Sequence, residues 1–167
     1  VCSTKPNFQK AWLLHSITEP DVTGAEIQIE GRDTSGLWEY DGDLVKIDRG
    51  EGFQGRLFVK TLLPVKHKIR KVGGNGYDAW VYGINYSPDK IMDPQHDEPG
   101  AWRIEIQPII LQKEDVFLHV LYPTDTSTSM MPPVEQKTST AGDKMYGAFI
   151  DDENSIAFSS IFCCLHP

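Results

Sequence analysis

The chain is 167 residues long, and its 24 acidic and 16 basic residues give it a net charge of −8. Nucleic acids and anionic membrane surfaces are polyanions, so this charge argues against both as partners. The length and a hydrophobic content of 40% predict one globular domain over residues 1–167. No stretch is long and apolar enough to cross a bilayer as a helix, and any export signal would already have been removed.

Short runs rich in Val, Ile, Phe, Trp and Tyr alternate with Gly, Pro, Asn and Asp. This pattern predicts an all-β fold, either an antiparallel two-layer β-sandwich or a compact cupin-like or jelly-roll barrel. The predicted strands are residues 10–17, 25–30, 44–48, 55–63, 68–72, 78–84, 101–110, 115–122, 145–150 and 155–160. No window has the apolar spacing of an amphipathic helix, so we expect little or no helix.

Two predicted connections are long, residues 85–100 and 123–144, and are rich in Pro, Asp, Ser or Thr. Long connections of this type are commonly mobile or functional rather than part of the core. The three cysteines lie at the chain ends and contain no CxxC pair, which excludes a zinc ribbon. A bridge from Cys2 to Cys163 or Cys164 and free thiols both remain open.

The first predicted strand, KAWLLHSI at 10–17, contains a histidine among apolar residues. Alternation places Trp12 and Leu14 on one face and Leu13 and His15 on the other. Both faces are apolar, so we expect a central strand that is covered on each side.

The stretch VGGNGYDAWVYG at 72–83 superficially resembles a phosphate-binding loop. It lacks the Lys-Ser/Thr pair and the helix that such a loop requires. A tight hairpin whose glycines adopt positive φ is the better interpretation.

The strand AWRIEIQP at 101–108 alternates strictly between apolar and polar residues. Trp102 and the following isoleucines belong to the core face, whereas Arg103, Glu105 and Gln107 form a row on the opposite face. Such a row can hold a sugar hydroxyl or carboxylate, and we take Trp102 with these three residues as the candidate substrate-binding set. A solvated sheet face with a cross-strand ion pair has the same appearance.

A second histidine lies among apolar residues in VFLHVLY at 116–122, and this strand is also expected to be central. Two buried imidazoles on neighbouring strands, His15 and His119, could bind one Zn or Cu ion. The possible third ligands are Glu19, Gln107, His67 and His96. Two hydrogen-bonded core histidines are the alternative, since no HxH or HxxxH motif supports the metal.

Five motifs occur in an order that resembles the β-sandwich portion of heparinase II/III-like polysaccharide lyases, over roughly residues 5–160. They are KAWLLHS, GRLFVKTLLP, VGGNG with a following W.YG.NY, GAWRIEIQP and DVFLHVLYP. The resemblance implies polysaccharide degradation by β-elimination next to a uronate carboxyl, and a structural metal in some members. The chain lacks the helical toroid that holds the lyase site, so no catalytic residue is carried over.

These observations leave several functions open. The first is a secreted or periplasmic protein that acts on polysaccharide, with one Zn or Cu ion bound by His15 and His119. The second is a non-catalytic carbohydrate-binding or accessory module that uses Trp38, Trp80, Trp102 and the Arg103 face. The third is a lyase remnant completed by another chain. A partial sandwich would leave an unpaired edge, so a homodimer formed by strand exchange is a further expectation.

Overall fold

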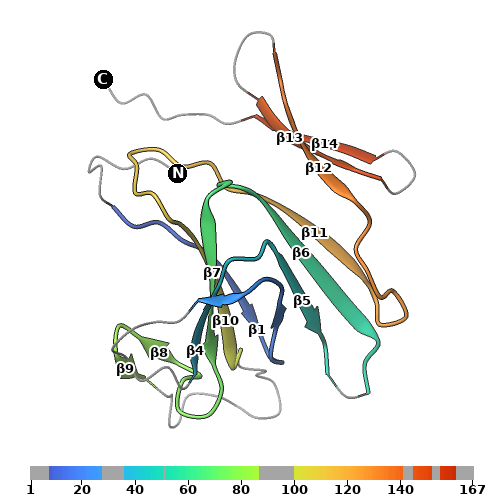
Figure 1. Ribbon diagram of the computed structural model, residues 1–167. Helices are drawn as coiled ribbons and strands as arrows, with labels where there is room; N and C mark the ends of the chain where they lie inside the picture. Colours follow the sequence, from blue (N-terminus) through green and yellow to red (C-terminus); the bar gives the residue numbers. More distant parts are fainter. Residues whose placement is uncertain are drawn as a thin grey trace.

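The computed structural model describes residues 8–27, 36–50, 52–86, 100–140, 145–151 and 155–160, the last of these as backbone. Its described residues form antiparallel β-strands joined by turns, and no helix occurs among them. Membrane-spanning helices are accordingly absent from the described residues. The sandwich expected from the sequence is confirmed, and no sheet closes into a barrel (Figure 1).

Two sheets form the body of the sandwich. The first sheet has the order β1-β10-β7-β4-β3, and the second has the order β11-β6-β5-β2. The strands of the first are β1 (Trp12–Ser16), β10 (Trp102–Pro108), β7 (His67–Gly73), β4 (Leu37–Tyr40) and β3 (Glu26–Ile27). Those of the second are β11 (Leu118–Asp125), β6 (Gly55–Leu63), β5 (Leu44–Asp48) and β2 (Asp21–Val22).

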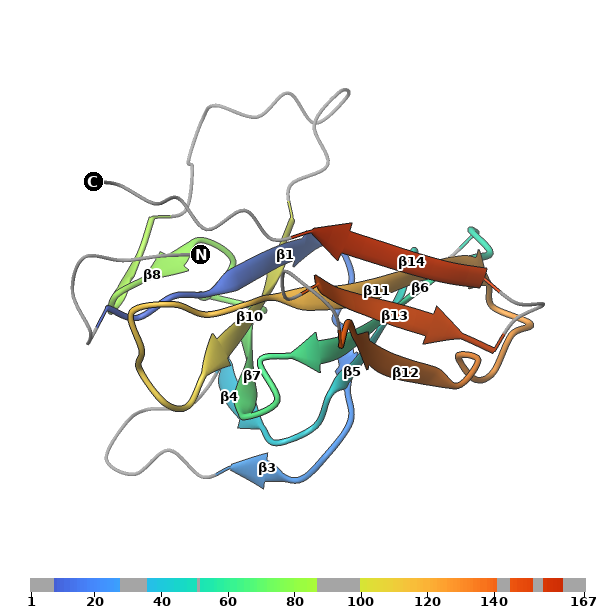
Figure 2. The same cartoon turned by 90° about the horizontal axis from the view of Figure 1, so that it is seen from above.

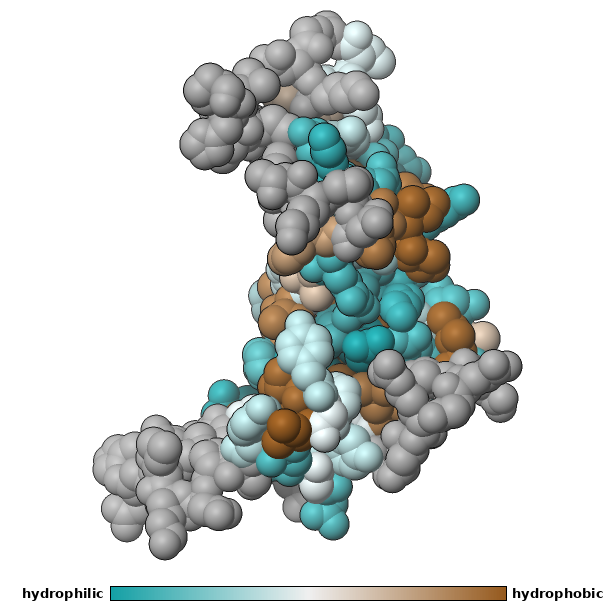
Figure 3. Space-filling view, turned by 90° about the vertical axis from the view of Figure 1, so that its left-hand side faces the viewer, coloured by the Kyte–Doolittle hydropathy of each residue, from teal (hydrophilic) through white to brown (hydrophobic). Residues whose placement is uncertain are grey.

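Two smaller units are attached to this body. A third sheet of β12 (Val134–Thr138), β13 (Met145–Ile150) and β14 (Ser155–Ser160) lies near β11 and β6 (Figure 2). A two-stranded hairpin of β8 (Trp80–Val81) and β9 (Ile84–Asn85) lies beside the first sheet. Figure 3 looks onto the outer face of the first sheet, where hydrophilic side chains cover the middle of the molecule.

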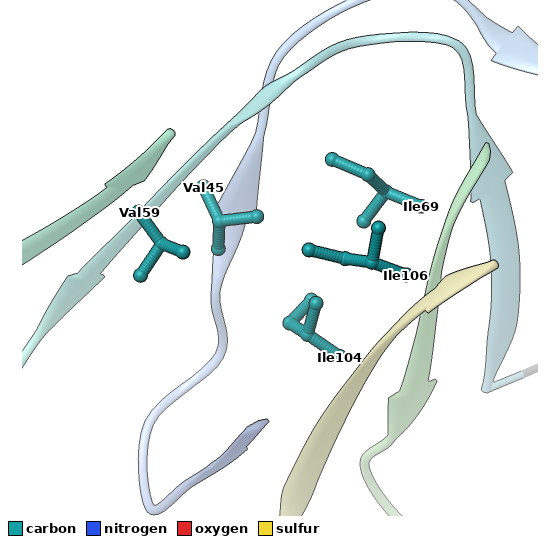
Figure 4. Close-up of a cluster of buried hydrophobic side chains, with 5 residues drawn as sticks. All are labelled: Val45, Val59, Ile69, Ile104 and Ile106. Carbon is teal, nitrogen blue, oxygen red and sulfur yellow. The ribbon is translucent and has the colours of Figure 1, made fainter. Parts of the chain in front are cut away.

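The core lies between the two main sheets. Strand alternation directs Ile104 and Ile106 of β10 and Ile69 of β7 toward Val45 and Val59 of the second sheet, and all five are 0% exposed (Figure 4). Fully burying a side chain of this size contributes about 1.5–3 kcal/mol, so the cluster helps to hold the two sheets together.

β1 and β11 are edge strands, so the prediction that both are central is wrong. Among the described strands, each pairs with one neighbour, β1 with β10 and β11 with β6. The rings of Trp12 and His119 stack at 4.3 Å, which places the two edges on the same side of the sandwich. Leu13 and Leu121 are 51% and 49% exposed, because an edge strand receives cover from one side only. The strand-exchange homodimer stays a prediction.

Alternation located most strands but missed short or polar ones. β5, β6, β13 and β14 have the predicted bounds, whereas residues 78–84 form part of a hairpin instead of one strand. β2 and β4 were missed because they have 2 and 4 residues. The prediction of a long connection at 123–144 is wrong, because β11 extends to Asp125 and the polar β12 pairs with β13. Residues 87–99 of the other connection, and all three cysteines, lie outside the described part of the chain.

Candidate functional site

The predicted polar row lies on the outer face of the first sheet. Arg103 donates from Nε to Glu105 Oε1 at 2.8 Å, and Gln107 donates from Nε2 to Glu105 Oε2 at 2.7 Å. Gln9 in turn donates to Gln107 Oε1 at 2.7 Å. The side chains of Arg103 and Glu105 are only 13% and 12% exposed. The row is therefore bonded along its length.

Neighbouring strands continue this row into a network. Register places Glu39 of β4 opposite Arg70 of β7, and Arg70 opposite Glu105 of β10. Arg70 donates to Glu39 Oε1 from Nε at 2.9 Å and from Nη2 at 2.6 Å, and Lys68 donates to the same oxygen at 2.8 Å. We call Glu39, Lys68, Arg70, Arg103, Glu105 and Gln107 the outer-face ladder.

The ladder is a cross-strand ion-pair network, the second interpretation that the sequence allowed. Burial raises the pKa of Glu39, but hydrogen bonds from Lys68 and Arg70 outweigh it and hold that pKa below its ordinary value. Charged groups that satisfy one another in this way have little capacity left for a ligand. The ladder stiffens the sheet and provides a platform for what is attached to it.

The β8–β9 hairpin is attached to this platform through Arg103. Its Nη2 donates to the carbonyl oxygen of Trp80 at 3.0 Å while its Nε holds Glu105. A planar guanidinium that makes both bonds fixes the strand of the hairpin relative to the sheet. The predicted contact of Arg103 with a ligand stays a prediction; the structure shows its guanidinium bonded to Glu105 and to the hairpin.

The tip of the hairpin breaks a local backbone preference. Trp80 pairs with Asn85 and Val81 with Ile84, which leaves Tyr82 and Gly83 as the two turn residues. Their φ angles are 48° and 93°, the positive pair expected for a type I′ turn. Gly83 suits this conformation, but a bulky residue at positive φ is uncommon and costs about 1–2 kcal/mol. Tyr82 is nevertheless 97% exposed, so side-chain packing does not offset this unfavourable backbone energy.

Further aromatic residues lie at the base of the hairpin, where the Tyr86 amide donates to the Ala79 carbonyl oxygen. Tyr86 is 61% exposed, while the rings of Tyr77 and Trp80 lie 6.3 Å apart and are partly buried. Asn85 accepts from the Ala79 amide at 2.9 Å and donates to Asp78 at 3.0 Å, which ties the strands together at the base. The hairpin is therefore a braced element with aromatic rings at its surface.

Gly73, Gly74 and Gly76 have the positive φ predicted for this stretch. They do not form the predicted tight hairpin, because β7 ends at Gly73 and β8 pairs with β9 instead. A Cβ on Gly73 would meet the Ala101 carbonyl oxygen at 2.5 Å, so only glycine fits this close approach. A shallow, open depression of about 500 Å³ lies between the turn, the hairpin and the start of β10. Its lining residues are Gly74, Asn75, Gly76, Asp78, Asn85 and Ala101.

Two of the sequence-predicted tryptophans are engaged inside the sandwich. Trp102 stacks on Trp38 at a centroid distance of 6.0 Å, and Lys71 Nζ lies 4.8 Å from the Trp38 ring and 5.6 Å from the Trp102 ring. Lys71 Nζ also donates to Glu19 at 2.7 Å. Trp102 therefore faces away from the Arg103 row, although its ring would meet a Cβ on Gly74 at 3.2 Å and so lies under the depression.

The structure does not bring His15 and His119 together. His15 is exposed on the outer face of β1 opposite Arg103, so the expectation that it is buried is wrong. His119 pairs with Thr61 on the inner face of the second sheet, where Nδ1 lies 3.2 Å from the Thr61 hydroxyl. Burial and the nearby His67 lower the pKa of His119 to about 4, and its Nε2 is buried without a partner.

The suggested third ligands do not complete a metal site among the described residues, which contain no group of three His, Cys, Asp or Glu able to hold an ion. His67 has both ring nitrogens within hydrogen-bonding distance of carbonyl oxygens, those of Pro64 at 2.7 Å and Gly42 at 3.1 Å. Glu19 and Gln107 are bonded as described above. His96 lies outside the described ranges.

Sequence reasoning missed Tyr82 because residues 78–84 were treated as one continuous strand. The available signal was the pair Tyr82–Gly83 between the apolar residues Val81 and Ile84, which fits a two-residue hairpin loop that ends in glycine. No protein-family model matches the chain, and no curated protein is significantly similar to it.

Proposed function

We propose that the protein binds carbohydrate without catalysing a reaction, and that the β8–β9 hairpin with the depression at its base is the contact surface. The observation that supports this most is Tyr82, a fully exposed aromatic residue held at positive φ. Strained backbone conformations that no side-chain packing offsets are concentrated at functional sites. A ring presented at a hairpin tip is a functional candidate for that reason.

The composition of this surface suits sugars. An aromatic ring offers a flat apolar face for the C–H groups of a sugar ring, and Tyr82 and Tyr86 both offer exposed rings. Asn75, Asp78 and Asn85 line the depression at the base of the hairpin, and amide and carboxylate groups are the kind that hydroxyls recognise. Pairing an apolar platform with a few polar groups is the general pattern of ligand sites.

The rigidity of the attachment supports the same proposal. The outer-face ladder is bonded across β4, β7 and β10. Arg103 belongs to this ladder and bonds to the Trp80 carbonyl oxygen, which holds the hairpin in a defined position on the sheet. A pre-ordered surface loses less entropy when it binds. The paired-histidine metal site is not part of this proposal, because the two imidazoles lie on different faces of different sheets.

The test compares the tip with an exposed aromatic residue elsewhere. Glycan retardation in native gels and calorimetric titration should show that Tyr82→Asn weakens binding by about tenfold, the loss of one aromatic anchor. Asn tolerates positive φ, so this variant folds without added strain. Phe53→Ala is the matched control, since Phe53 is 58% exposed in the turn between β5 and β6. Equal affinity in wild type and Tyr82→Asn would overturn the assigned surface.

A further inference from the structure

The turn between β7 and β8 has the dipeptide Asn75–Gly76 at its centre. The Tyr77 amide donates to the Gly74 carbonyl oxygen at 2.9 Å, so Asn75 and Gly76 are the central residues of a β-turn. Gly76 has a φ of 81°, as the third residue of a type II turn requires. Both central residues are exposed, and Asn75 lines the depression at the base of the hairpin.

An asparagine followed by glycine can react with its own backbone in water. The Gly76 nitrogen gives up its proton and attacks Cγ of Asn75, the bond from Cγ to the side-chain nitrogen breaks, and that nitrogen leaves as ammonia with a proton from water. The product is a cyclic imide. Water then adds to either carbonyl carbon of the imide and opens it, which leaves aspartate or isoaspartate with one more negative charge. Gly76 lacks a Cβ, so little hinders its nitrogen.

The structure distinguishes this asparagine from Asn85, which lines the same depression. Asn85 accepts from the Ala79 amide at 2.9 Å and donates to Asp78 at 3.0 Å. Its amide cannot turn toward the next peptide nitrogen without breaking these bonds. The residue that follows is Tyr86, whose side chain hinders the attacking nitrogen.

The related dipeptide Asp41–Gly42 is also held in place. Asp41 Oδ1 accepts from the Ala25 amide at 2.6 Å, and a Cβ on Gly42 would overlap the Thr23 carbonyl oxygen. At Gly76, by contrast, no described atom lies within 4 Å of such a Cβ. The exposed turn before the hairpin therefore has room to rotate into the geometry that ring closure requires.

We propose that Asn75 is a site of spontaneous deamidation, and that the reaction alters the glycan surface with time. The modification itself is independent of the proposed function, whereas its effect on binding rests on that function. An amide both donates and accepts hydrogen bonds, but a carboxylate accepts only. The reaction therefore removes a donor from the lining of the depression. Loss of one hydrogen bond predicts glycan binding that is about threefold to tenfold weaker.

The first experiment follows the modification in the full chain. The protein is kept at body temperature, at neutral and at mildly alkaline pH, and its peptides are mapped by mass spectrometry over time. We expect Asn75 to lose its amide faster at the higher pH, because the attacking nitrogen must give up its proton, while Asn85 keeps its amide. Aspartate and isoaspartate should both form at position 75. Asn75→Gln is the matched control, since its longer side chain closes a larger and less favourable ring.

The same chain unfolded in urea shows whether the folded turn permits the reaction. Loss of the Asn75 amide in both states supports the inference. Loss in the unfolded chain with retention in the folded chain would overturn it, because the turn would then protect the residue. Aspartate without isoaspartate would overturn the cyclic route, since direct hydrolysis by water gives aspartate alone.

The second experiment measures the consequence for binding. Cellohexaose, mannohexaose, xylohexaose and hexagalacturonate are titrated into the fresh chain, the aged chain and Asn75→Asp. The aged chain and the variant should both bind more weakly than the fresh chain; unchanged affinity would overturn the effect on binding and leave the modification standing. Absence of binding to every probe, or binding that Tyr82→Asn leaves unchanged, would overturn the proposed function, while mass spectrometry still decides the modification.

Discussion

The outer-face ladder and the β8–β9 hairpin lie on the same side of the first sheet and use their polar and aromatic groups in opposite ways. In the ladder, each charged group has a charged partner and the side chains of Glu39, Arg70, Arg103 and Glu105 are 9–17% exposed. In the hairpin, Tyr82 is 97% exposed and its backbone is strained. The comparison teaches that a row of polar residues can be part of the scaffold, while the proposed ligand surface is the hairpin that this row supports.

The largest expected effect tests whether the ladder is structural. Glu39→Ala leaves Arg70 and Lys68 without their acceptor, and we expect the free energy of unfolding to fall by about 2–3 kcal/mol. The pKa of Glu39 is lowered, so its contribution is present at neutral pH and is lost as pH falls through that lowered pKa. Denaturant unfolding at pH 7 and in acid measures both effects. Glu135→Ala, which breaks the exposed pair with Lys137, should change stability much less; equal losses would show that the ladder is ordinary surface charge.

The second effect is a loss of stability in acid that comes from His119 in the interior of the sandwich and not from the ladder. His119 has a native pKa of about 4, below its ordinary value, so the unfolded chain binds an extra proton as pH falls. Stability should be complete above about pH 6.5 and should decline toward pH 4 by about 2 kcal/mol, allowing for partial exposure of the ring. His119→Phe keeps a ring against Trp12 and should remove this decline, which thermal unfolding across the pH range will show. A decline of the same size in the variant would exclude His119 as its source.

The third effect concerns the link between the two regions. Arg103→Lys retains the positive charge beside Glu105. A lysine ammonium lacks the planar set of N–H donors with which Arg103 bonds to Glu105 and to the Trp80 carbonyl at the same time. We expect glycan affinity to fall about threefold to tenfold while the free energy of unfolding changes by about 1 kcal/mol or less. Hydrogen exchange of the hairpin amides should accelerate in parallel. Unchanged exchange together with lower affinity would mean that Arg103 touches the ligand directly.

The smallest effect has the opposite sign. Tyr82→Asn relieves the strained φ without removing a packed side chain, so we expect stability to rise by about 0.5–1 kcal/mol as ligand affinity falls. Gly83→Ala serves as its counterpart: no atom lies within 4 Å of the added Cβ, so any loss reports the positive φ alone. A destabilised Tyr82→Asn would show that the ring supports the fold.

The sequence by itself determined the all-β class, the alternation of β10 and the core positions Ile104 and Ile106, because side-chain alternation is a local property of a strand. It also determined the glycine turn before the hairpin, since few residues adopt positive φ. For the candidate site it supplied the polar row, whose role in ligand contact stays a prediction, and it did not single out Tyr82.

The tertiary structure decided which strands are neighbours, and several interpretations depended on that. Alternation cannot show that β1 and β11 are edges, that Arg70 and Glu39 lie beside Glu105, or that His15 and His119 face away from each other. Strand pairing joins residues far apart in the chain, so it is fixed by the packing of the whole sandwich. The hydrogen bond from Arg103 to the Trp80 carbonyl also depends on the tertiary structure, because it links two segments that no local sequence pattern connects. This bond holds the hairpin in place on the outer face of the first sheet.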